Sequence, residues 1–273
     1  MNVTAEVSRV GRRADNSEWM DHAVRVGLVS YGVVHLVLAW LAMQLAFGAS
    51  SSKANQQGAL QELAGNTVGR LSLWIVGVGF VALVVWQLME AAWGHRDARG
   101  GKRVFKRIGS VAKVVIYASL GFTAFKTAAN GRSGGGGGTD GITGKIMQLP
   151  AGPLLVGLIG AAVVGVAGYL VRQGWQEKFR KKLSGKGQTG KDGSAYVLFG
   201  KIGYIAKGVA LAIVGLLFVY AAVTHDPNKS GGLDQALHEL LQQPFGPVLL
   251  VAVAVGFGCY GLFCFAWARH LER

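Results

Sequence analysis

Residues 201–223 read KIGYIAKGVALAIVGLLFVYAAV, and this stretch decides the fold. It is one apolar run, about as long as the ~20 residues that an α-helix needs to cross a ~30 Å hydrocarbon core. The segment LDQALHELLQQPFG follows at 233–246, and a second apolar run, PVLLVAVAVGFGCYGLFCFAW, at 247–267. Two apolar runs joined by a short amphipathic segment predict two transmembrane helices with an interfacial helix between them.

The same plan occurs twice earlier in the chain, so the sequence holds three tandem repeats. Hydrophobic residues make up 51% of the 273 residues, charged residues make up 15%, and the mean hydropathy is +0.36. These values favour membrane-spanning helices over buried helices of a soluble protein. We therefore predict an all-α integral membrane protein in which three two-helix repeats form a bundle with pseudo-threefold symmetry. The six spans are expected at Val24–Phe47, Leu71–Trp93, Val111–Ala129, Leu154–Val171, Tyr196–Val223 and Val248–Trp267.

The net charge of +14 is concentrated on one side of this predicted topology, where 20 of the 28 Lys and Arg residues fall. By the positive-inside rule, both termini and the two most basic links are cytoplasmic. The predicted parts of the chain are a polar cytoplasmic arm at 1–22, repeat one at 23–94, a basic cytoplasmic link at 95–107, repeat two at 108–175, a second basic cytoplasmic link at 176–195, and repeat three at 196–270.

Basic links also raise the question of partners. Because topology alone accounts for the charge, we expect no nucleic-acid partner, and we expect contacts with membrane lipids, whose anionic headgroups attract such links. The dense cationic run Lys178–Lys191 either contacts lipid or a partner protein or is a solvated loop, and the solvated loop is the simpler interpretation. The two cysteines, Cys259 and Cys264, lie on different faces of one predicted helix, which suits small packing residues better than a disulfide.

The first helices of the three repeats share a pattern with a spacing of four residues, which keeps the aligned positions near one helix face. Pseudo-threefold symmetry would bring one aligned position of the three repeats, occupied by Tyr31, Lys113 and Lys207, together at the bundle axis, where the two lysines could hold an anionic group. The aligned sets, in order along the helix, are Gly27, Gly109 and Gly203; Tyr31, Lys113 and Lys207; and His35, Tyr117 and Leu211.

The repeated motif, Gly-x3-Lys followed by Ala-Leu-x-Glu-Leu-x4-Phe-Gly, resembles a bacterial membrane family, common in actinobacteria, that is catalogued as domain of unknown function 1206. Repeat one has Tyr31 in place of the lysine, and repeat two has Lys145 in place of the glutamate. The resemblance implies a multi-pass protein of the bacterial plasma (inner) membrane, and it implies no activity. The best match, in repeat three, comprises Gly203, Lys207, Gly208, Ala236, Leu237, Glu239, Leu240, Pro244, Phe245 and Gly246.

Ionisable residues inside apolar segments are the candidates for a site, because burying a charge in lipid is costly. For Lys113 and Lys207 the alternative is that the amines snorkel to the interface. For Glu90 the alternative to a ligand site is a structural ion pair, and for His35 the alternative is a packing role with a hydrogen bond. The predicted ligand-binding residues are Tyr31, His35, Glu90, Lys113, Tyr117 and Lys207.

Enzyme signatures are missing from the sequence, which has no G-x-S-x-G, G-x-x-x-x-G-K-[ST] or H-E-x-x-H motif. We therefore expect no catalytic residues, no metal, no cofactor and no enzymatic activity. The leading hypothesis is an accessory or structural subunit that associates with other membrane-protein chains or with copies of itself. The alternative is a small transporter or lipid-binding protein with an anionic-ligand site near the pseudo-threefold axis.

Overall fold

The computed structural model describes residues 18–48, 54, 56–65, 67–93, 101–130 and 139–271. Most of the predicted polar arm, part of the first basic link and the Gly-rich stretch at 131–138 lie outside these described residues. Within the described part the secondary structure is helical, apart from one isolated β-bridge between Leu183 and Leu271.

In the described residues, six long α-helices and three short ones follow the predicted repeat plan. All six long helices are long and apolar enough to cross a membrane, which confirms the six predicted spans. The short helices α3, α6 and α9 each lie between two long helices, where the amphipathic segments were predicted. The helices are α2 (Glu18–Ala46), α3 (Gln56–Leu63), α4 (Thr67–Trp93), α5 (Gly101–Asn130), α6 (Thr139–Met147), α7 (Gly152–Trp175), α8 (Gly190–Thr224), α9 (Leu233–Leu241) and α10 (Gly246–Arg269).

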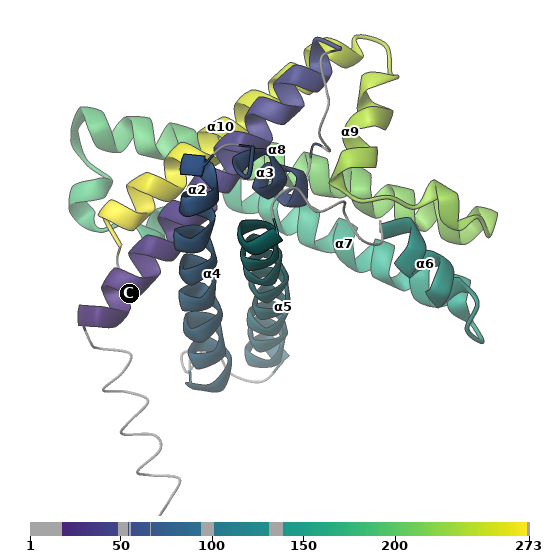
Figure 1. Ribbon diagram of the computed structural model, residues 1–273, viewed down its shortest axis with the longest axis horizontal. Helices are drawn as coiled ribbons and strands as arrows, with labels where there is room; N and C mark the ends of the chain where they lie inside the picture. The colour runs from purple at the N-terminus through teal and green to yellow at the C-terminus, as the bar shows by residue number, and fades with distance from the viewer. Residues whose placement is uncertain are drawn as a thin grey trace, which may run out of the picture. The chain divides into compact units, whose positions relative to one another are not determined.

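The chain divides into two compact units. The first comprises residues up to Tyr31 together with Leu63–Arg132, and the second comprises Gly32–Glu62 together with Ser133–Arg273. In the first unit α4 and α5 pack side by side (Figure 1). Glycine allows this contact, because a Cβ atom on Gly77 would come within 2.6 Å of the Phe125 ring.

In the second unit α8 packs against α7 on one face and against α10 on another. A Cβ atom on Gly160 of α7 would lie 2.8 Å from the Gly215 carbonyl oxygen of α8. On the other face, a Cβ atom on Gly203 would lie 2.6 Å from the Tyr260 Cα atom of α10. Glycines at both contacts therefore let α8 approach α7 and α10 closely.

Repeats two and three re-enter the predicted membrane through the same turn. Ala151 and Phe245 adopt left-handed backbone conformations, with φ of 59° and 61°, immediately before α7 and α10. The next residue is glycine in both repeats, and a Cβ atom there would overlap the carbonyl oxygen of Ile146 or Leu241. In repeat one the aligned Gly69 lies inside α4 instead, so this turn is shared by two repeats.

Both predicted basic links are partly helical. Helix α5 begins at Gly101, within the link predicted at 95–107, and α8 begins at Gly190, within the link at 176–195. Once a transmembrane helix has formed, its extension into water requires no new nucleation step, and Lys and Arg are good helix formers. The pseudo-threefold arrangement of the repeats concerns the packing of the two units and stays a prediction.

Candidate functional site

The basic link between α7 and α8 packs against the rest of the second unit through two buried apolar side chains. It forms the short 3-10 helices η1 (Lys178–Lys182) and η2 (Gly185–Gly187). Phe179 and Leu183 are both 0% exposed. The Ser184 amide donates to the His270 carbonyl oxygen at 2.9 Å, which ties the link to the end of α10. The expectation of a solvated loop therefore fits the exposed cations of this part of the link, but it is wrong for Phe179 and Leu183, which belong to the core.

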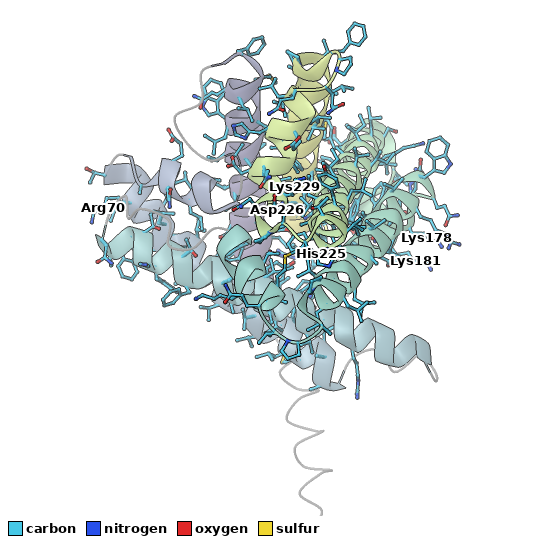
Figure 2. All side chains as sticks on the ribbon, turned by 90° about the vertical axis from the view of Figure 1, so that its right-hand side faces the viewer. Arg70, Lys178, Lys181, His225, Asp226 and Lys229 are labelled. Carbon is cyan, nitrogen blue, oxygen red and sulfur yellow. The ribbon has the colours of Figure 1, made fainter. Side chains whose placement is uncertain are left out.

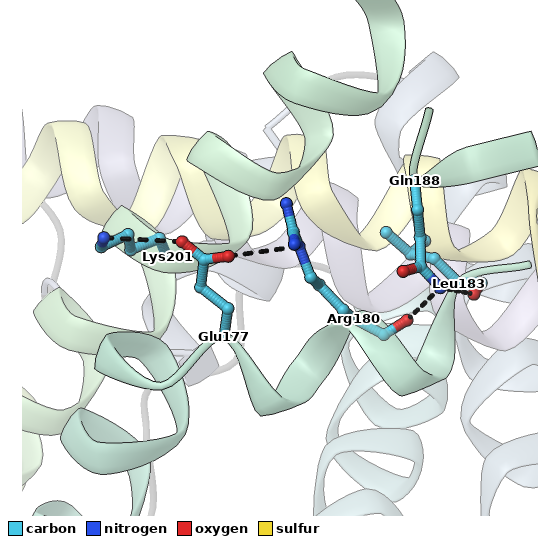
Figure 3. Close-up of polar contacts among 5 residues, drawn as sticks. All are labelled: Glu177, Arg180, Leu183, Gln188 and Lys201. Carbon is cyan, nitrogen blue, oxygen red and sulfur yellow. Dashed lines mark hydrogen bonds and ion pairs between the residues drawn. The ribbon is translucent and has the colours of Figure 1, made fainter. Parts of the chain in front are cut away.

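Polar contacts hold this link in one conformation (Figure 3). Glu177 pairs with Arg180 at 3.2 Å and with Lys201 of α8 at 3.5 Å. The Gln188 amide nitrogen donates to the carbonyl oxygens of Arg180 and Leu183, at 3.0 and 2.6 Å. These contacts leave Lys178 and Lys181 exposed, and Figure 2 shows both at the surface.

Lys182, the last residue of η1, points inward. Its Nζ atom donates to the Tyr204 hydroxyl oxygen at 2.6 Å and lies 4.3 Å from the centroid of the Trp267 ring. Burial, together with the positive charge of Lys207, lowers the pKa of Lys182 to about 8. None of the ion pairs in the described part of the chain includes Lys182. Its ammonium group is therefore held by a hydroxyl group and aromatic faces.

Lys207 approaches the same group of aromatic rings from within α8. Its Nζ atom lies 4.2 Å from the centroid of the Tyr260 ring and 3.4 Å from Nε2 of His35. His35, on the part of α2 that belongs to the second unit, is 1% exposed. If the lysine is charged it donates, so His35 is neutral and accepts through Nε2. The amine of Lys207 is thus directed toward α2 and α10.

Aromatic side chains connect the two lysines. Phe179 stacks on Tyr204 with ring centroids 5.4 Å apart, and Tyr204 meets the edge of Tyr260 at 5.3 Å. Phe263 contacts the rings of Phe179, Tyr204 and Tyr260. We call the following set the lysine–aromatic cluster: His35, Lys182, Tyr204, Lys207, Tyr260 and Trp267. The cluster offers several N–H and O–H donors at the end of the unit where η1 meets α8 and α10.

Comparison with known proteins places this chain in a family. Residues 26–94, 108–177 and 202–270 each match the family model described as Domain of Unknown Function (DUF1206). The chain belongs to the DUF1206 family. A Bacillus subtilis (strain 168) relative, described as "Uncharacterized protein YxxB", is 29% identical over 258 residues, which cover 92% of this chain and 91% of the relative. No solved structure matches the chain.

The lysine–aromatic cluster draws on more than one part of the DUF1206 pattern. The third matched repeat contributes four of its residues, and the first repeat contributes His35. Lys182 lies between the second and third matched stretches and so belongs to no repeat. A DUF1206 repeat by itself therefore does not form this cluster.

The structure also shows where the other predicted site residues lie. Tyr31 is buried in the first unit and contacts Tyr117, with ring centroids 5.5 Å apart, and Phe80, at 6.3 Å. Lys113 is exposed on α5, and Glu90 is half-buried on α4. The structure thus brings His35 to Lys207 and Tyr31 to Tyr117. Ligand binding at these DUF1206 residues stays a prediction.

The sequence analysis missed Lys182, Tyr204, Tyr260 and Trp267. The sequence held one sign that the basic run packs against the core. Phe179 and Leu183 lie four residues apart within it, a spacing that places both on one face of a helix. The other three residues lay inside apolar segments, where aromatic residues are ordinary. In the described part of the chain, Cys259 and Cys264 are free thiols, and no three His, Cys, Asp or Glu side chains are grouped as metal ligands.

Proposed function

We propose that this multi-pass membrane protein binds a small anionic ligand, one with a phosphate or carboxylate group, at the lysine–aromatic cluster. The observation that carries the proposal is the convergence of two lysine side chains on one buried group of aromatic rings. Lys182 and Lys207 contact the neighbouring rings of Tyr204 and Tyr260, and His35 lies beside Lys207.

The energetic argument concerns the ammonium group of Lys182. Removing a charge from water is costly unless a partner compensates, and cation–π contacts return about 0.5–2 kcal/mol each. The lowered pKa of Lys182, about 8, reflects this incomplete compensation. A bound anion would favour the charged form of the lysine. Ligand binding and lysine protonation are therefore expected to support each other.

The chemistry of the surrounding groups suits recognition of an anion more than catalysis. Lysine and the hydroxyl of tyrosine donate hydrogen bonds, and charge-assisted hydrogen bonds to phosphate or carboxylate oxygens are about twice as strong as neutral ones. The side chains of the cluster include no carboxylate to act as a general base. We accordingly propose a binding protein without enzymatic activity, with the site facing the cytoplasm at the basic side.

Thermal unfolding of the purified full chain in detergent tests the proposal. Inorganic phosphate and acetate are added separately over a range of concentrations, and Tm is measured. A ligand at 100 times its Kd should stabilise the folded state by about 2.7 kcal/mol. We expect Tm to rise with at least one anion in the wild-type protein, and not in Lys182→Met or Lys207→Met.

Lys181→Met is the matched control, because Lys181 lies next to Lys182 in η1 and is exposed. It removes the same charge without touching the cluster and should keep the anion-dependent rise. Absence of any rise in the wild-type protein would contradict the proposal. An equal rise in wild type, Lys182→Met and Lys207→Met would assign the anion effect to another part of the chain.

An accessory role is the second candidate function, and one feature of α7 favours it. Ala161 and Gly165 are exposed at a spacing of four, and no atom lies within 4 Å of a Cβ built on Gly165. Small residues at this spacing let a second transmembrane helix approach closely. The partner would be another membrane protein or a second copy of this chain. Purification from native membranes tests the role: a stoichiometric second chain supports it, and a monomer without partners contradicts it.

A further inference from the structure

A groove about 590 Å³ in volume runs between α7 and α8 in the second unit. Its walls are apolar side chains such as Val209 and Ile213 of α8. Gly168 of α7 also lines the groove and has no side chain to fill it, and no atom lies within 4 Å of a Cβ built there. Both helices are long and apolar enough to cross a membrane, and in a membrane a groove between them would open toward lipid.

One end of the groove differs chemically from the rest. Arg172, Trp175 and Gln176 line it there, at the end of α7 that precedes η1. Trp175 is 72% exposed, as expected for a residue at the membrane–water interface. The groove therefore runs from the apolar middle of two spans to a polar end at the predicted cytoplasmic interface.

Arg172 is available to a ligand at this end. Its Nε atom donates to Oε1 of Gln176 at 3.2 Å, and none of the ion pairs in the described part of the chain includes it. The two Nη groups of its guanidinium can therefore bind phosphate oxygens in a bidentate manner. Two further exposed cations, Lys178 and Lys181, follow in η1 and add positive charge to the same end of the unit.

We propose that this groove binds an anionic phospholipid of the cytoplasmic leaflet. One acyl chain lies in the groove beside Gly168, and the phosphodiester binds Arg172. The occupant follows from the combination of an apolar groove open to the membrane with an arginine at its interfacial end. The exposed Lys178 and Lys181 then favour an anionic headgroup over a zwitterionic one.

This lipid site is separate from the lysine–aromatic cluster. Lys207 faces α10, where it contacts the Tyr260 ring, whereas Val209 and Ile213 face the groove with α7. A variant of one site is therefore not expected to alter the other.

Native mass spectrometry of the full chain, released from nanodiscs of equal phosphatidylglycerol and phosphatidylcholine, tests the proposal. The wild-type protein should retain phosphatidylglycerol in preference to phosphatidylcholine. Gly168→Leu fills the groove and should lose the retained lipid. Gly165→Leu is its matched control, because it adds the same side chain to α7 at a glycine outside the groove with equally open space.

The headgroup contact is tested with Arg172→Gln, which should reduce the preference for phosphatidylglycerol by roughly tenfold. Arg269→Gln is the control, because Arg269 is an exposed arginine in the last turn of another span, α10. Lys182→Met should leave lipid retention unchanged, so this proposal and the anion site can fail separately.

Two results would overturn the lipid site. Equal retention in wild type and Gly168→Leu would mean annular lipid only. A preference for phosphatidylglycerol that survives in Arg172→Gln would show that the arginine does not bind the headgroup.

Discussion

At the scale of single residues, the second unit surrounds the amine of Lys182 mainly with aromatic side chains. Lys182 contacts Tyr204 and Trp267, and burial lowers its pKa to about 8. The hydroxyl of Tyr204 and the faces of both rings favour the ammonium group, but they compensate its lost hydration only in part. The protonation of this residue is consequently coupled to the stability of the fold.

The coupling predicts a particular dependence of stability on pH. An exposed lysine in the unfolded chain has a pKa of about 10.4, so between pH 8 and that value the unfolded state binds more protons than the folded state. The free energy of unfolding attributable to Lys182 should rise with pH across this window, by at most about 1.4 kcal/mol per pH unit. Below pH 8 the amine is charged in both states, and its contribution becomes constant.

Chemical denaturation of the wild-type protein and of Lys182→Met, at pH values from 7 to 10.5, measures this effect. The difference between the two curves isolates Lys182 from the other lysines. Lys182→Arg stays charged throughout and should show no such rise. Parallel wild-type and Lys182→Met curves would show that Lys182 has an ordinary pKa in the folded protein.

At the scale of secondary structure elements, close helix contacts depend on which glycines face a neighbour. Gly160 of α7 lies against Gly215 and Phe218 of α8, whereas Gly165, little more than one turn later, has open space around it. The same residue type in one helix therefore serves two purposes. Gly160 permits close contact between α7 and α8, whereas Gly165 leaves the surface of α7 without a side chain at that position.

This difference predicts opposite effects of one substitution. In Gly160→Ala the new methyl group would meet the Gly215 carbonyl oxygen at 2.8 Å, so α7 and α8 must separate, at a cost of about 1–3 kcal/mol. Gly165→Ala meets nothing within 4 Å and should be neutral or stabilise the protein by up to about 1 kcal/mol. Thermal unfolding in detergent distinguishes them: equal Tm values would refute the assigned α7–α8 contact.

At the scale of the whole molecule, the length of α8 bears on which side of the membrane its two flanking segments lie. It contains 35 residues and is therefore about 50 Å long, more than the ~30 Å thickness of the hydrocarbon core. Helix η1 precedes α8, and the 3-10 helix η3 (Pro227–Lys229) follows it. Figure 2 labels residues of both segments. A single crossing by α8 would place these two segments on opposite sides of a membrane.

The charge distribution then predicts which side is which. The basic η1 segment should be cytoplasmic and η3 external, with both termini cytoplasmic. In a variant with Cys259 and Cys264 replaced by alanine, a membrane-impermeant maleimide applied to intact cells should label Asn228→Cys. Lys181→Cys should react only after the membrane is permeabilised, and both parent side chains are exposed. Labelling of Lys181→Cys in intact cells would reverse the proposed orientation.

The sequence by itself determined the six spans, the three short helices and the repeats, because the length and spacing of apolar residues are local properties that need no knowledge of distant contacts. The tertiary structure decided which side chains meet. His35 and Lys207 are separated by 172 positions, yet their nitrogen atoms lie 3.4 Å apart. The inward direction of Lys182 depends on the packing of Phe179 against rings of α8 and α10 and of Leu183 beside Leu271, and so it follows from packing between segments.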